Sequence, residues 1–239
     1  MIHRFETIDS TMYEAARLAA AGCPHLTAVV AEEQTAGHGR YGRPWHSARG
    51  EGLYVSIVLR LELAPAHLPV VTLALGVAAA EAIAHAAGVR CDLRWPNDVL
   101  IDEKKCAGIL TELHGGAVVA GIGINCNHAS FPEELREIAT SLRLATGKSV
   151  DREALLNELL KQTASTAALL QKQGPEPVLL LFENASSYVR GRRVTVELPD
   201  GEVEGVTDGL DPAGFLLLRR DNGERLTILA GGVRPARKL

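Results

Sequence analysis

Hydrophobic positions repeat with helical spacing at two places in the N-terminal half of the chain. Residues 13–21 place alanine and leucine at helical intervals directly after Ser10 and Thr11, and these two residue types favour the N-cap of a helix. Residues 68–87 form a longer apolar run that ends at Gly88. The pattern therefore predicts a short helix and then a long buried helix.

Strand-like spacing fills the segments around these helices. Residues 26–33, 53–61 and 89–95 are rich in apolar and β-branched side chains. Residues 105–113 and 117–127 have the same character and are separated only by His-Gly-Gly, so they predict an antiparallel hairpin. Helices and strands in this mixture indicate an α+β domain.

The expected register of this hairpin produces a groove. If Leu113 faces Ala117, then Lys105 faces Asn125. One face then carries Lys105, Ala107 and Ile109 opposite Asn125, Gly123 and Gly121. Glycine within a strand often marks close approach by a ligand, which predicts a trench of nearly bare backbone with a lysine and an amide at one end. The alternative is that the glycines only accommodate a neighbouring helix.

Helices are expected again after the hairpin. Residues 132–139 predict a short helix, and residues 151–174 predict a long amphipathic helix that starts with an aspartate N-cap. A further helix is expected after Pro177. The helical pattern ends near residue 190.

The C-terminal residues change character to short strands. Turn signals at Asp200-Gly201, Asp208-Gly209 and Asn222-Gly223 separate strand-like segments. Closely spaced strands of this kind predict a compact barrel. The chain is therefore expected to consist of an α+β domain over residues 1–189 and a small β domain over residues 190–239.

The composition indicates a globular protein without an overall basic field. The 239 residues are 46% hydrophobic and carry a formal net charge of −4, which argues against nonspecific nucleic-acid binding and against a polybasic membrane anchor. The four cysteines contain no Cys-x-x-Cys pair, so reduced thiols are expected rather than a zinc site. The N-terminus lacks an apolar signal core, and the expected location is the cytoplasm.

Residues 34–45 combine closely spaced glycines with two arginines. The glycines let the backbone approach a ligand, and Arg40 and Arg43 present guanidinium groups that match phosphate or carboxylate oxygens. This composition predicts a flexible lid over an anion, with a plain solvated loop as the alternative. The spacing Gly-x-Gly-x-x-Gly also occurs in dinucleotide-binding loops, but no helical pattern follows it, so that interpretation is rejected.

Five motifs, in order, resemble the signature of biotin protein ligases. They are Ser10-Thr11, the loop over residues 34–45, Arg94-Trp95-Pro96-Asn97-Asp98, Lys105-Cys106-Ala107-Gly108-Ile109-Leu110 and Gly121-Ile122-Gly123-Ile124-Asn125. The likeness extends into the C-terminal β module and covers essentially the whole chain. It implies a class II synthetase-like catalytic domain, with a mixed and largely antiparallel sheet flanked by helices, followed by an SH3-like β-barrel.

The resemblance implies a two-step ligase reaction. The carboxylate of biotin attacks the α-phosphate of ATP to give biotinyl-5′-AMP and pyrophosphate, and a lysine of a biotin carboxyl carrier protein then attacks the mixed anhydride. Fixed cations lower the cost of bringing two anions together, and Arg40, Arg43 and Lys105 can supply them. The implied co-substrate and metal are ATP and Mg²⁺, and the implied partner is the carrier protein of acetyl-CoA carboxylase. A monomer or a homodimer is expected.

The resemblance also implies roles for individual residues. Catalytic roles fall to Lys105, Arg40 and Asp98, of which Asp98 is expected to orient or deprotonate the acceptor lysine. Biotin would be bound by Ser10, Thr11, Gln34, His38, Gly39, Arg40, Lys105, Gly108, Gly121 and Gly123. ATP would be bound by Arg40, Arg43, Trp45, Asn97, Lys105 and Asn125, and Asn97 would also lie near Mg²⁺. Structural alternatives are a helix cap for Ser10, a turn cap for Asp98 and a wall or core position for Trp45.

The sequence departs from the family pattern at three positions. His38 stands where the family most often has arginine, Arg94 where lysine is usual and Met12 where asparagine is usual. His38 lacks a permanent charge, so retention of the adenylate is expected to be weaker or pH-dependent. The predicted first helix begins almost at Met1, which leaves no room for the DNA-binding domain of some relatives, so repressor activity is not expected.

Three other functions are weaker interpretations. A lipoate or octanoyl ligase on the same scaffold would carry an Arg-Arg, triple-glycine loop, which this sequence lacks. A biotin-sensing module without catalysis would not need Lys105. A DNA-binding regulator is disfavoured by the acidic balance of the chain.

Overall fold

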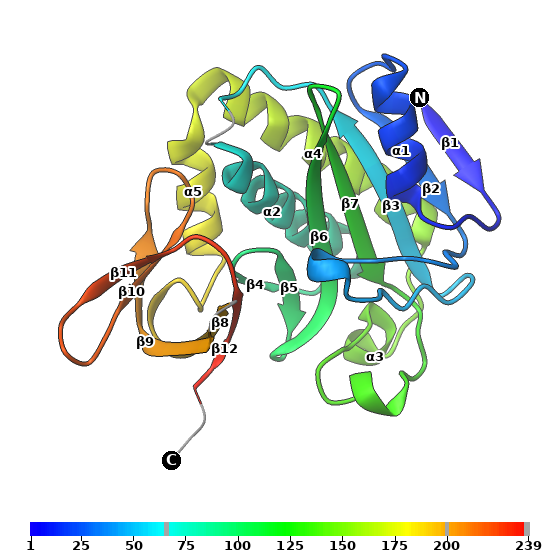
Figure 1. Cartoon of the computed structure of the whole chain (residues 1–239). Helices are drawn as coiled ribbons and strands as arrows, with labels where there is room; N and C mark the ends of the chain where they lie inside the picture. Colours follow the sequence, from blue (N-terminus) through cyan, green and yellow to red (C-terminus); the bar gives the residue numbers. More distant parts are fainter. Residues whose placement is uncertain (65–66, 199–200, 237–239) are drawn as a thin grey trace.

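A seven-stranded sheet, in the order β1-β2-β3-β7-β6-β5-β4, forms the centre of the N-terminal part of the molecule (Figure 1). The computed structural model describes residues 1–64, 67–198 and 201–236. β1 and β2 are parallel, and the other neighbouring pairs are antiparallel. The strands are β1 (Ile2–Phe5), β2 (Thr27–Ala31), β3 (Gly52–Leu59), β4 (Asp92–Arg94), β5 (Asp98–Ile101), β6 (Lys104–His114) and β7 (Ala117–Asn125). The prediction of a mixed, largely antiparallel sheet is confirmed.

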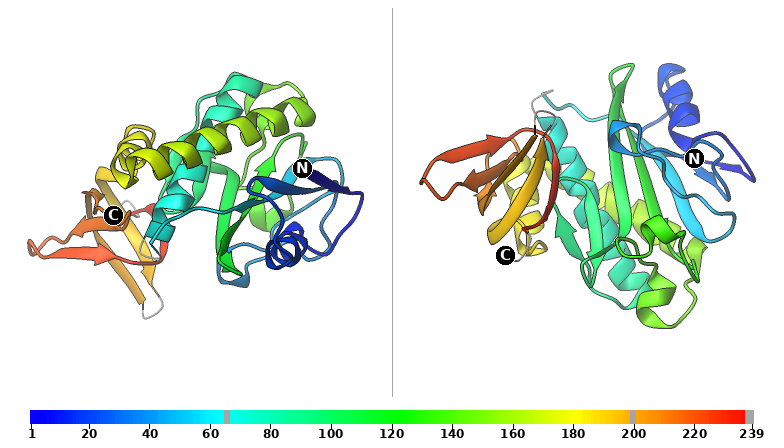
Figure 2. Two further views of the ribbon diagram at one scale, coloured as in Figure 1. Left: turned by 90° about the horizontal axis from the view of Figure 1, so that it is seen from above. Right: turned by 60° about the horizontal axis from the view of Figure 1, so that its bottom comes forward.

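Helices cover both faces of this sheet (Figures 1 and 2). α1 (Thr11–Ala20) packs on one face, while α2 (Leu68–Ala87), α4 (Arg152–Gln173) and α5 (Pro175–Asn184) form the layer on the other. Alternate residues of β2 show the division, because Ala28 and Val30 join the larger core and Val29 joins the small core under α1.

The long helix α2 is the centre of the larger core. It is apolar enough and long enough to cross a membrane, but 67% of its most apolar window is buried inside the protein. Helices α4 and α5 and strand β6 all pack against it. These contacts are those of a core helix, as the unbroken apolar run predicts.

Two helix predictions need correction, and one short helix was missed. Residues 132–139 form only a short 3₁₀ turn, at Glu133–Leu135, because Pro132 adopts an extended backbone and the apolar side chains there face the site rather than a helix core. α5 begins at Pro175 instead of after Pro177, since Gly174 ends α4 and proline is well tolerated in the first turn of a helix. A short helix, α3 (Leu142–Thr146), was not predicted, although Ser141 caps it.

The predicted hairpin of β6 and β7 is confirmed, but its predicted register is wrong by one residue. His114 pairs with Ala117, so the turn contains only Gly115 and Gly116. Both glycines have positive φ angles, which suits a two-residue hairpin turn. As a result, Gly123 faces Gly108. The other glycine of the predicted trench, Gly121, faces Leu110 instead of Ile109.

The C-terminal residues form a five-stranded antiparallel sheet. Its order is β11-β10-β9-β8-β12, with β8 (Arg190–Leu198), β9 (Gly201–Leu210), β10 (Leu216–Arg219), β11 (Arg225–Ile228) and β12 (Gly232–Pro235). In the described part of the chain β11 and β12 are the two edges and do not pair with each other, so a closed barrel is not confirmed. Strand β12 was not predicted.

The turns between these strands agree only in part with prediction. Asn222-Gly223 is a turn, as predicted. Asp208-Gly209 is not, because β9 continues through both residues and the chain reverses after it, where the Asp211 carboxylate accepts bonds from two backbone amides. Asp200 lies outside the described residues, so the predicted turn there is untested.

The C-terminal sheet lies against the N-terminal part of the chain (Figure 2). The indole of Trp95 donates a 3.0 Å hydrogen bond to the carbonyl oxygen of Gly214, and a side-chain nitrogen of Arg40 donates one of 3.0 Å to the carbonyl oxygen of Gly231. Buried residues of β8 and β10 belong to the same hydrophobic cluster as α2. The sheet is thereby held beside the loop that contains residues 34–45.

Candidate active site

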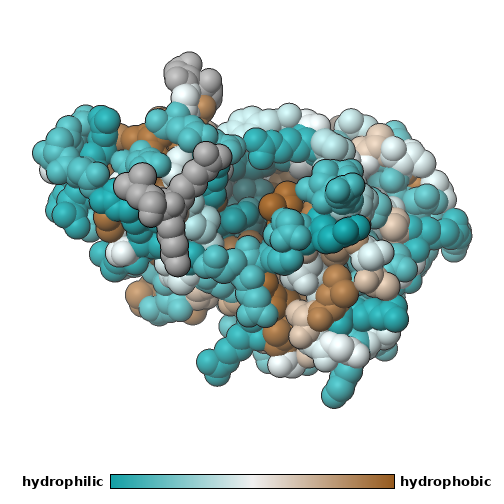
Figure 3. Space-filling model, turned by 90° about the horizontal axis from the view of Figure 1, so that it is seen from below, coloured by the Kyte–Doolittle hydropathy of each residue, from teal (hydrophilic) through white to brown (hydrophobic). Residues whose placement is uncertain are grey.

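A cavity of about 580 Å³ lies between the large sheet, the loop over residues 34–45 and the C-terminal sheet. In the view from below, the surface is hollowed and partly apolar between hydrophilic rims (Figure 3). All the site residues predicted from sequence line this cavity: Ser10, Thr11, Gln34, His38, Gly39, Arg40, Arg43, Trp45, Asn97, Asp98, Lys105, Gly108, Gly121, Gly123 and Asn125. The structure therefore brings the whole predicted set together, although the roles of its members stay predictions.

The loop over residues 34–45 closes one side of the cavity. Two backbone hydrogen bonds fold it back on itself, from the amide of Gly39 to the carbonyl of Arg43 at 2.8 Å and from the amide of Trp45 to the carbonyl of Gly37 at 2.9 Å. A 3₁₀ turn at Arg40–Gly42 forms its tip. No helix follows the tip, since the chain continues to β3, which agrees with rejecting a dinucleotide-binding loop.

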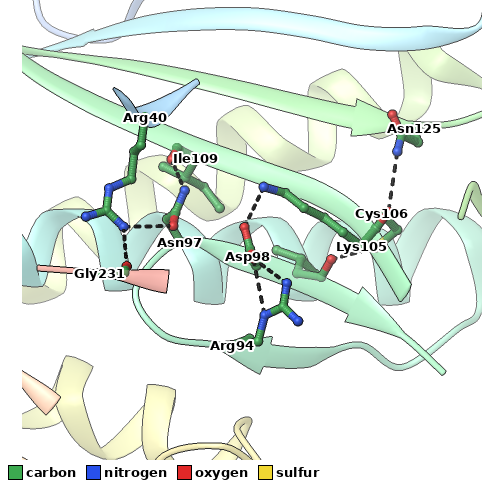
Figure 4. A network of polar contacts seen from close by, with 10 residues as sticks. Arg40, Arg94, Asn97, Asp98, Lys105, Cys106, Ile109, Asn125 and Gly231 are labelled. Carbon is green, nitrogen blue, oxygen red and sulfur yellow. Dashed lines mark hydrogen bonds and ion pairs between the residues drawn. The ribbon is translucent and has the colours of Figure 1, made fainter. Parts of the chain in front are cut away.

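Arg40 reaches from this loop to two other parts of the chain. Its guanidinium donates to the side-chain oxygen of Asn97 at 3.4 Å and to the carbonyl of Gly231 at 3.0 Å (Figure 4). Asn97 is itself held by donating to the carbonyl of Ile109 at 2.9 Å. Arg43 makes a 3.4 Å ion pair with Glu197 of β8, but its side chain is largely exposed, so this contact is weak.

Asp98 lies between two cations at the start of β5 (Figure 4). One carboxylate oxygen is 2.5 Å from the ammonium of Lys105, and the other accepts bonds of 3.3 and 2.7 Å from Arg94. Burial alone would raise the pKa of Asp98, but the positive charges of Lys105 and Arg94 outweigh it and hold this pKa below its ordinary value. Asp98 is thus a strand residue in an ion-pair network, not the cap of a turn.

Glycines form the floor on which Trp45 rests. A Cβ atom on Gly123 would lie 2.5 Å from the indole ring of Trp45, and one on Gly108 would lie 3.1 Å from it. The ammonium of Lys105 is 5.3 Å from the centre of the same ring. The other glycine, Gly121, instead accommodates helix α1, because a Cβ there would lie 2.8 Å from the sulfur of Met12. The helix interpretation therefore holds for Gly121, whereas Gly123 makes room for the Trp45 ring, and close approach by a ligand stays a prediction.

Neutral polar side chains form the other end of the cavity. Ser10 caps α1 by accepting a 3.3 Å bond from the amide of Met12, so its role as a cap is confirmed while it also lines the cavity. Gln34 accepts bonds of 2.9 and 3.0 Å from the amide and the hydroxyl of Thr11. Such an arrangement of matched donors and acceptors suits a neutral polar ring rather than a charged group.

Several lining residues were not predicted. Aromatic and apolar side chains contribute Phe131, Leu135 and Ile138, and the C-terminal sheet contributes Glu197, Leu198, Gly231 and Gly232. Behind Phe131, the His128 ring stacks on it at 5.0 Å and is 98% buried, and neither ring nitrogen has a protein partner among the described residues. Among Phe131, Leu135 and Ile138, only Phe131 belongs to a string, Phe131-Pro132, that resembles the family pattern.

The cavity has few oxygen ligands for a metal ion. Within residues 1–64, 67–198 and 201–236, no three His, Cys, Asp or Glu side chains come together. Asn97 lines the cavity, and its amide oxygen, which accepts a long 3.4 Å bond from Arg40, is a ligand type that Mg²⁺ accepts. Magnesium is often bound through one or two protein oxygens together with substrate phosphates. The residues present therefore fit a Mg²⁺ ion that is held largely by a nucleotide.

Comparison with protein families assigns both parts of the chain. The model described as the biotin/lipoate A/B protein ligase family matches residues 4–128, which is more than half of the chain. The chain belongs to this family. The model described as the biotin protein ligase C terminal domain matches residues 190–233.

Relatives within the family align over nearly the whole chain. The bifunctional ligase/repressor BirA of Bacillus spizizenii is 38% identical over 225 residues, which cover 91% of this chain and 69% of the relative. The biotin–[acetyl-CoA-carboxylase] ligase of Paracoccus denitrificans is 34% identical, with 91% of this chain and 94% of the relative covered. A structure of the biotin protein ligase from Aquifex aeolicus in complex with biotin and ATP is 33% identical, has a TM-score of 0.87 and matches 99% of both chains.

Proposed function

We propose that this protein is a biotin protein ligase that uses ATP to activate biotin as biotinyl-5′-AMP and transfers biotin to a lysine of a biotin carboxyl carrier protein. The observation that carries the proposal is that Arg40 and Lys105 line one cavity together with a neutral polar end and a glycine floor. The relatives named biotin–[acetyl-CoA-carboxylase] ligase and the similar structure with biotin and ATP support this assignment.

The cations of the cavity suit the activation step. When biotin attacks ATP, one oxygen of the biotin carboxylate forms a bond to the α-phosphorus. The bond from this phosphorus to the pyrophosphate oxygen breaks, and pyrophosphate leaves with its electron pair. Lys105, which Asp98 holds at the cavity wall, would stabilise the negative charge that gathers between the two reactants. Arg40, which is anchored on Gly231, would do so from the loop side.

The remaining groups suit binding and protection of the intermediate. Ser10, Thr11 and Gln34 would bind the ureido ring of biotin, and Trp45, which rests on the glycine floor, would form an aromatic wall beside the ligand. Asn97 would contribute an oxygen to Mg²⁺, which screens the charge of the ATP phosphates when bound. The folded loop over residues 34–45 would exclude water, which otherwise hydrolyses the anhydride.

Several finer features belong to the same proposal. The chain would consist of a catalytic domain over residues 1–189, of the class II synthetase type, and a C-terminal domain over residues 190–239 with an SH3-like arrangement. The carrier protein of acetyl-CoA carboxylase would be the acceptor, as the printed name of the Paracoccus relative suggests. The protein would act in the cytoplasm as a monomer or homodimer, without binding nucleic acid or membrane.

Two assays separate this function from its rivals. Biotin with MgATP should release pyrophosphate, whereas a biotin sensor without catalysis would bind biotin and release none. In thermal unfolding, biotin should raise the melting temperature and lipoate should not, because only a ligand bound by the folded state stabilises it. Stabilisation by lipoate alone, with lipoate-dependent pyrophosphate release, would contradict the proposal and favour a lipoate ligase.

A further inference from the structure

A chain of side-chain hydrogen bonds runs from the polar end of the cavity to the loop. Ser56 and Thr11 lie 2.8 Å apart through their hydroxyl oxygens, and the hydroxyl of Thr11 donates to Gln34 at 3.0 Å. The amide nitrogen of Gln34 donates to the hydroxyl oxygen of Ser47 at 3.0 Å, and Ser47 donates to the carbonyl of Trp45 at 3.1 Å. Ser47 therefore links Gln34, at the polar end of the cavity, to the backbone of Trp45 at the other end of the loop.

The direction of these bonds is fixed by chemistry. The backbone amide of Thr11 can only donate, and its bond to Gln34 therefore identifies the carbonyl end of that amide group. The NH₂ end must then face Ser47 and donate to it. Since a hydroxyl has one hydrogen, Ser47 uses that hydrogen for the carbonyl of Trp45. Each member of the chain thus holds the next in one orientation.

The surroundings of Ser47 leave little freedom for other arrangements. Ser47 is 8% exposed. A Cβ atom on Gly37 would lie 2.7 Å from the hydroxyl oxygen of Ser47 and 2.9 Å from the side-chain nitrogen of Gln34. The backbone of the loop therefore packs directly on the bond between these two side chains. Glycine at position 37 is what makes room for it.

The last hydrogen bond of this series holds the residue whose ring lies on the glycine floor. The carbonyl that Ser47 holds belongs to Trp45, whose ring lies on Gly123 and near the ammonium of Lys105. The amide of the same residue closes the loop through its 2.9 Å bond to Gly37. The position of the Trp45 backbone therefore affects both the placement of the Trp45 ring on the glycine floor and the closure of the loop.

We propose that Ser47 is a positioning residue that couples occupation of the polar end of the cavity to closure of the loop. The inference rests on the proposed function, because it takes Thr11 and Gln34 as the groups that bind the ureido ring. A ring bound there strengthens the hold on the Gln34 amide group in the orientation that donates to Ser47, and so stabilises the bond from Ser47 to the Trp45 carbonyl. Ser47 thereby passes the effect of the bound ring to the backbone bonds that already fold the loop back on itself.

Hydrogen exchange of the loop amides tests this coupling in the full-length protein. Exchange within residues 37–45 is measured with and without biotin in wild type, in Ser47→Ala and in Ser149→Ala, where an exposed serine outside the cavity is changed. Biotin should slow loop exchange in wild type and in Ser149→Ala. In Ser47→Ala, at saturating biotin, the protection factor should fall on the order of tenfold, the effect of losing about one net hydrogen bond.

The result that overturns the coupling is equal biotin-dependent protection of the loop in Ser47→Ala and wild type. Calorimetry of wild type with biotin distinguishes failure of the coupling from failure of the proposed function. Absence of biotin binding to wild type would contradict the function itself. Binding of biotin to wild type without any protection of residues 37–45 would leave the function standing and reject the coupling. A uniform rise in exchange across the whole of Ser47→Ala, with the loop still protected by biotin as in wild type, would also reject it.

Discussion

The ammonium of Lys105 lies 2.5 Å from the carboxylate of Asp98, and both side chains face the cavity from neighbouring strands, β6 and β5. The two opposite charges are partly buried, so the pair is screened less than one at the surface. Arg94 neutralises the second oxygen of the same carboxylate. The network therefore holds one positive charge in excess at the cavity wall.

Replacement of Asp98 tests its part in the transfer step. The lowered pKa keeps Asp98 ionised at neutral pH, where it can accept a hydrogen bond from an incoming lysine amine, although it is a weak base. Asp98→Asn should slow transfer from preformed biotinyl-5′-AMP by at least tenfold, measured as biotinylation of a carrier domain in a single turnover. Unchanged transfer from the preformed adenylate would show that Asp98 serves only to place Lys105.

Replacement of Gly123 tests the seat of Trp45. The new Cβ in Gly123→Ala would lie 2.5 Å from the indole, so the ring must move away from the floor. The emission of Trp45 should shift to longer wavelength and the adenylate should dissociate about tenfold faster. Gly76→Ala is the matched control, because its Cβ would meet Phe182 at an ordinary 3.5 Å inside the core. Equal adenylate dissociation in both variants would contradict the assignment.

His38 is expected to weaken retention of the adenylate relative to an arginine. Its ring stacks on Tyr13 of α1, with centroids 5.2 Å apart, at the edge of the cavity. His38→Arg adds a permanent cation there and should slow adenylate release by about two- to fivefold, the range for a partly exposed charge pair. The exposed residue His85, outside the cavity, provides the control His85→Arg, and an off-rate unaltered by His38→Arg would refute the prediction.

Because His128 is buried, we expect the free energy of unfolding to fall in mildly acidic solution. Burial, with a smaller contribution from the charge of His46, lowers the pKa of His128 to about 4. An unfolded histidine, with a pKa of about 6.5, takes up its proton first, so the free energy of unfolding falls as pH drops from about 6.5 towards 4 and the loss is complete below that. The contribution of His128 has a slope of up to about 1.4 kcal/mol per pH unit.

The variant His128→Gln isolates this contribution. His25 also has a pKa lowered by burial and acts in the same direction, so a comparison between variants is needed. Asp98 affects stability in a different pH range. A carboxylate with a lowered pKa loses its contribution to the free energy of unfolding only below the ordinary carboxylate range. Urea unfolding between pH 7 and 4.5 should show a shallower slope for the variant than for wild type. Parallel slopes would contradict the prediction.

The hairpin shows how far local sequence determines the site. Its strands and its glycines could be predicted, yet one residue in the turn decided the register, because side chains alternate between faces along a strand. A second irregularity restores Lys105 to the cavity, since β5 and β6 shift register between Val99 and Leu100. The Lys105 ammonium then lies 2.9 Å from where a Cβ on Gly108 would be. The predicted face was therefore wrong, because Ala107 and Ile109 belong to the core, although Lys105, Gly121 and Gly123 do line the cavity.

Contacts between distant segments could not be predicted. The bond from Arg40 to Gly231 joins residues 191 positions apart, and no spacing within the chain encodes it. Ser47 gave no signal, because a single serine after a loop has many possible partners. By contrast, the cavity residues predicted from the motifs lie in short stretches of sequence. The residues of one stretch stay close together as long as its strand or loop forms. Local chemistry was predictable, whereas the joining of the segments depended on the packing of the two sheets.

Mass spectrometry of a biotin carboxyl carrier domain, incubated with this protein, biotin and MgATP, tests whether the cations of the cavity drive ligation. The wild-type protein should add one biotinyl group to one lysine of the carrier. Lys105→Gln should reduce the rate by about 10²–10³-fold, the effect of removing one fixed group that stabilises charge in a transition state, while the fold, followed by circular dichroism, is retained. A carrier that gains no mass with wild type, or gains it equally fast with Lys105→Gln, would contradict the proposed reaction at this site.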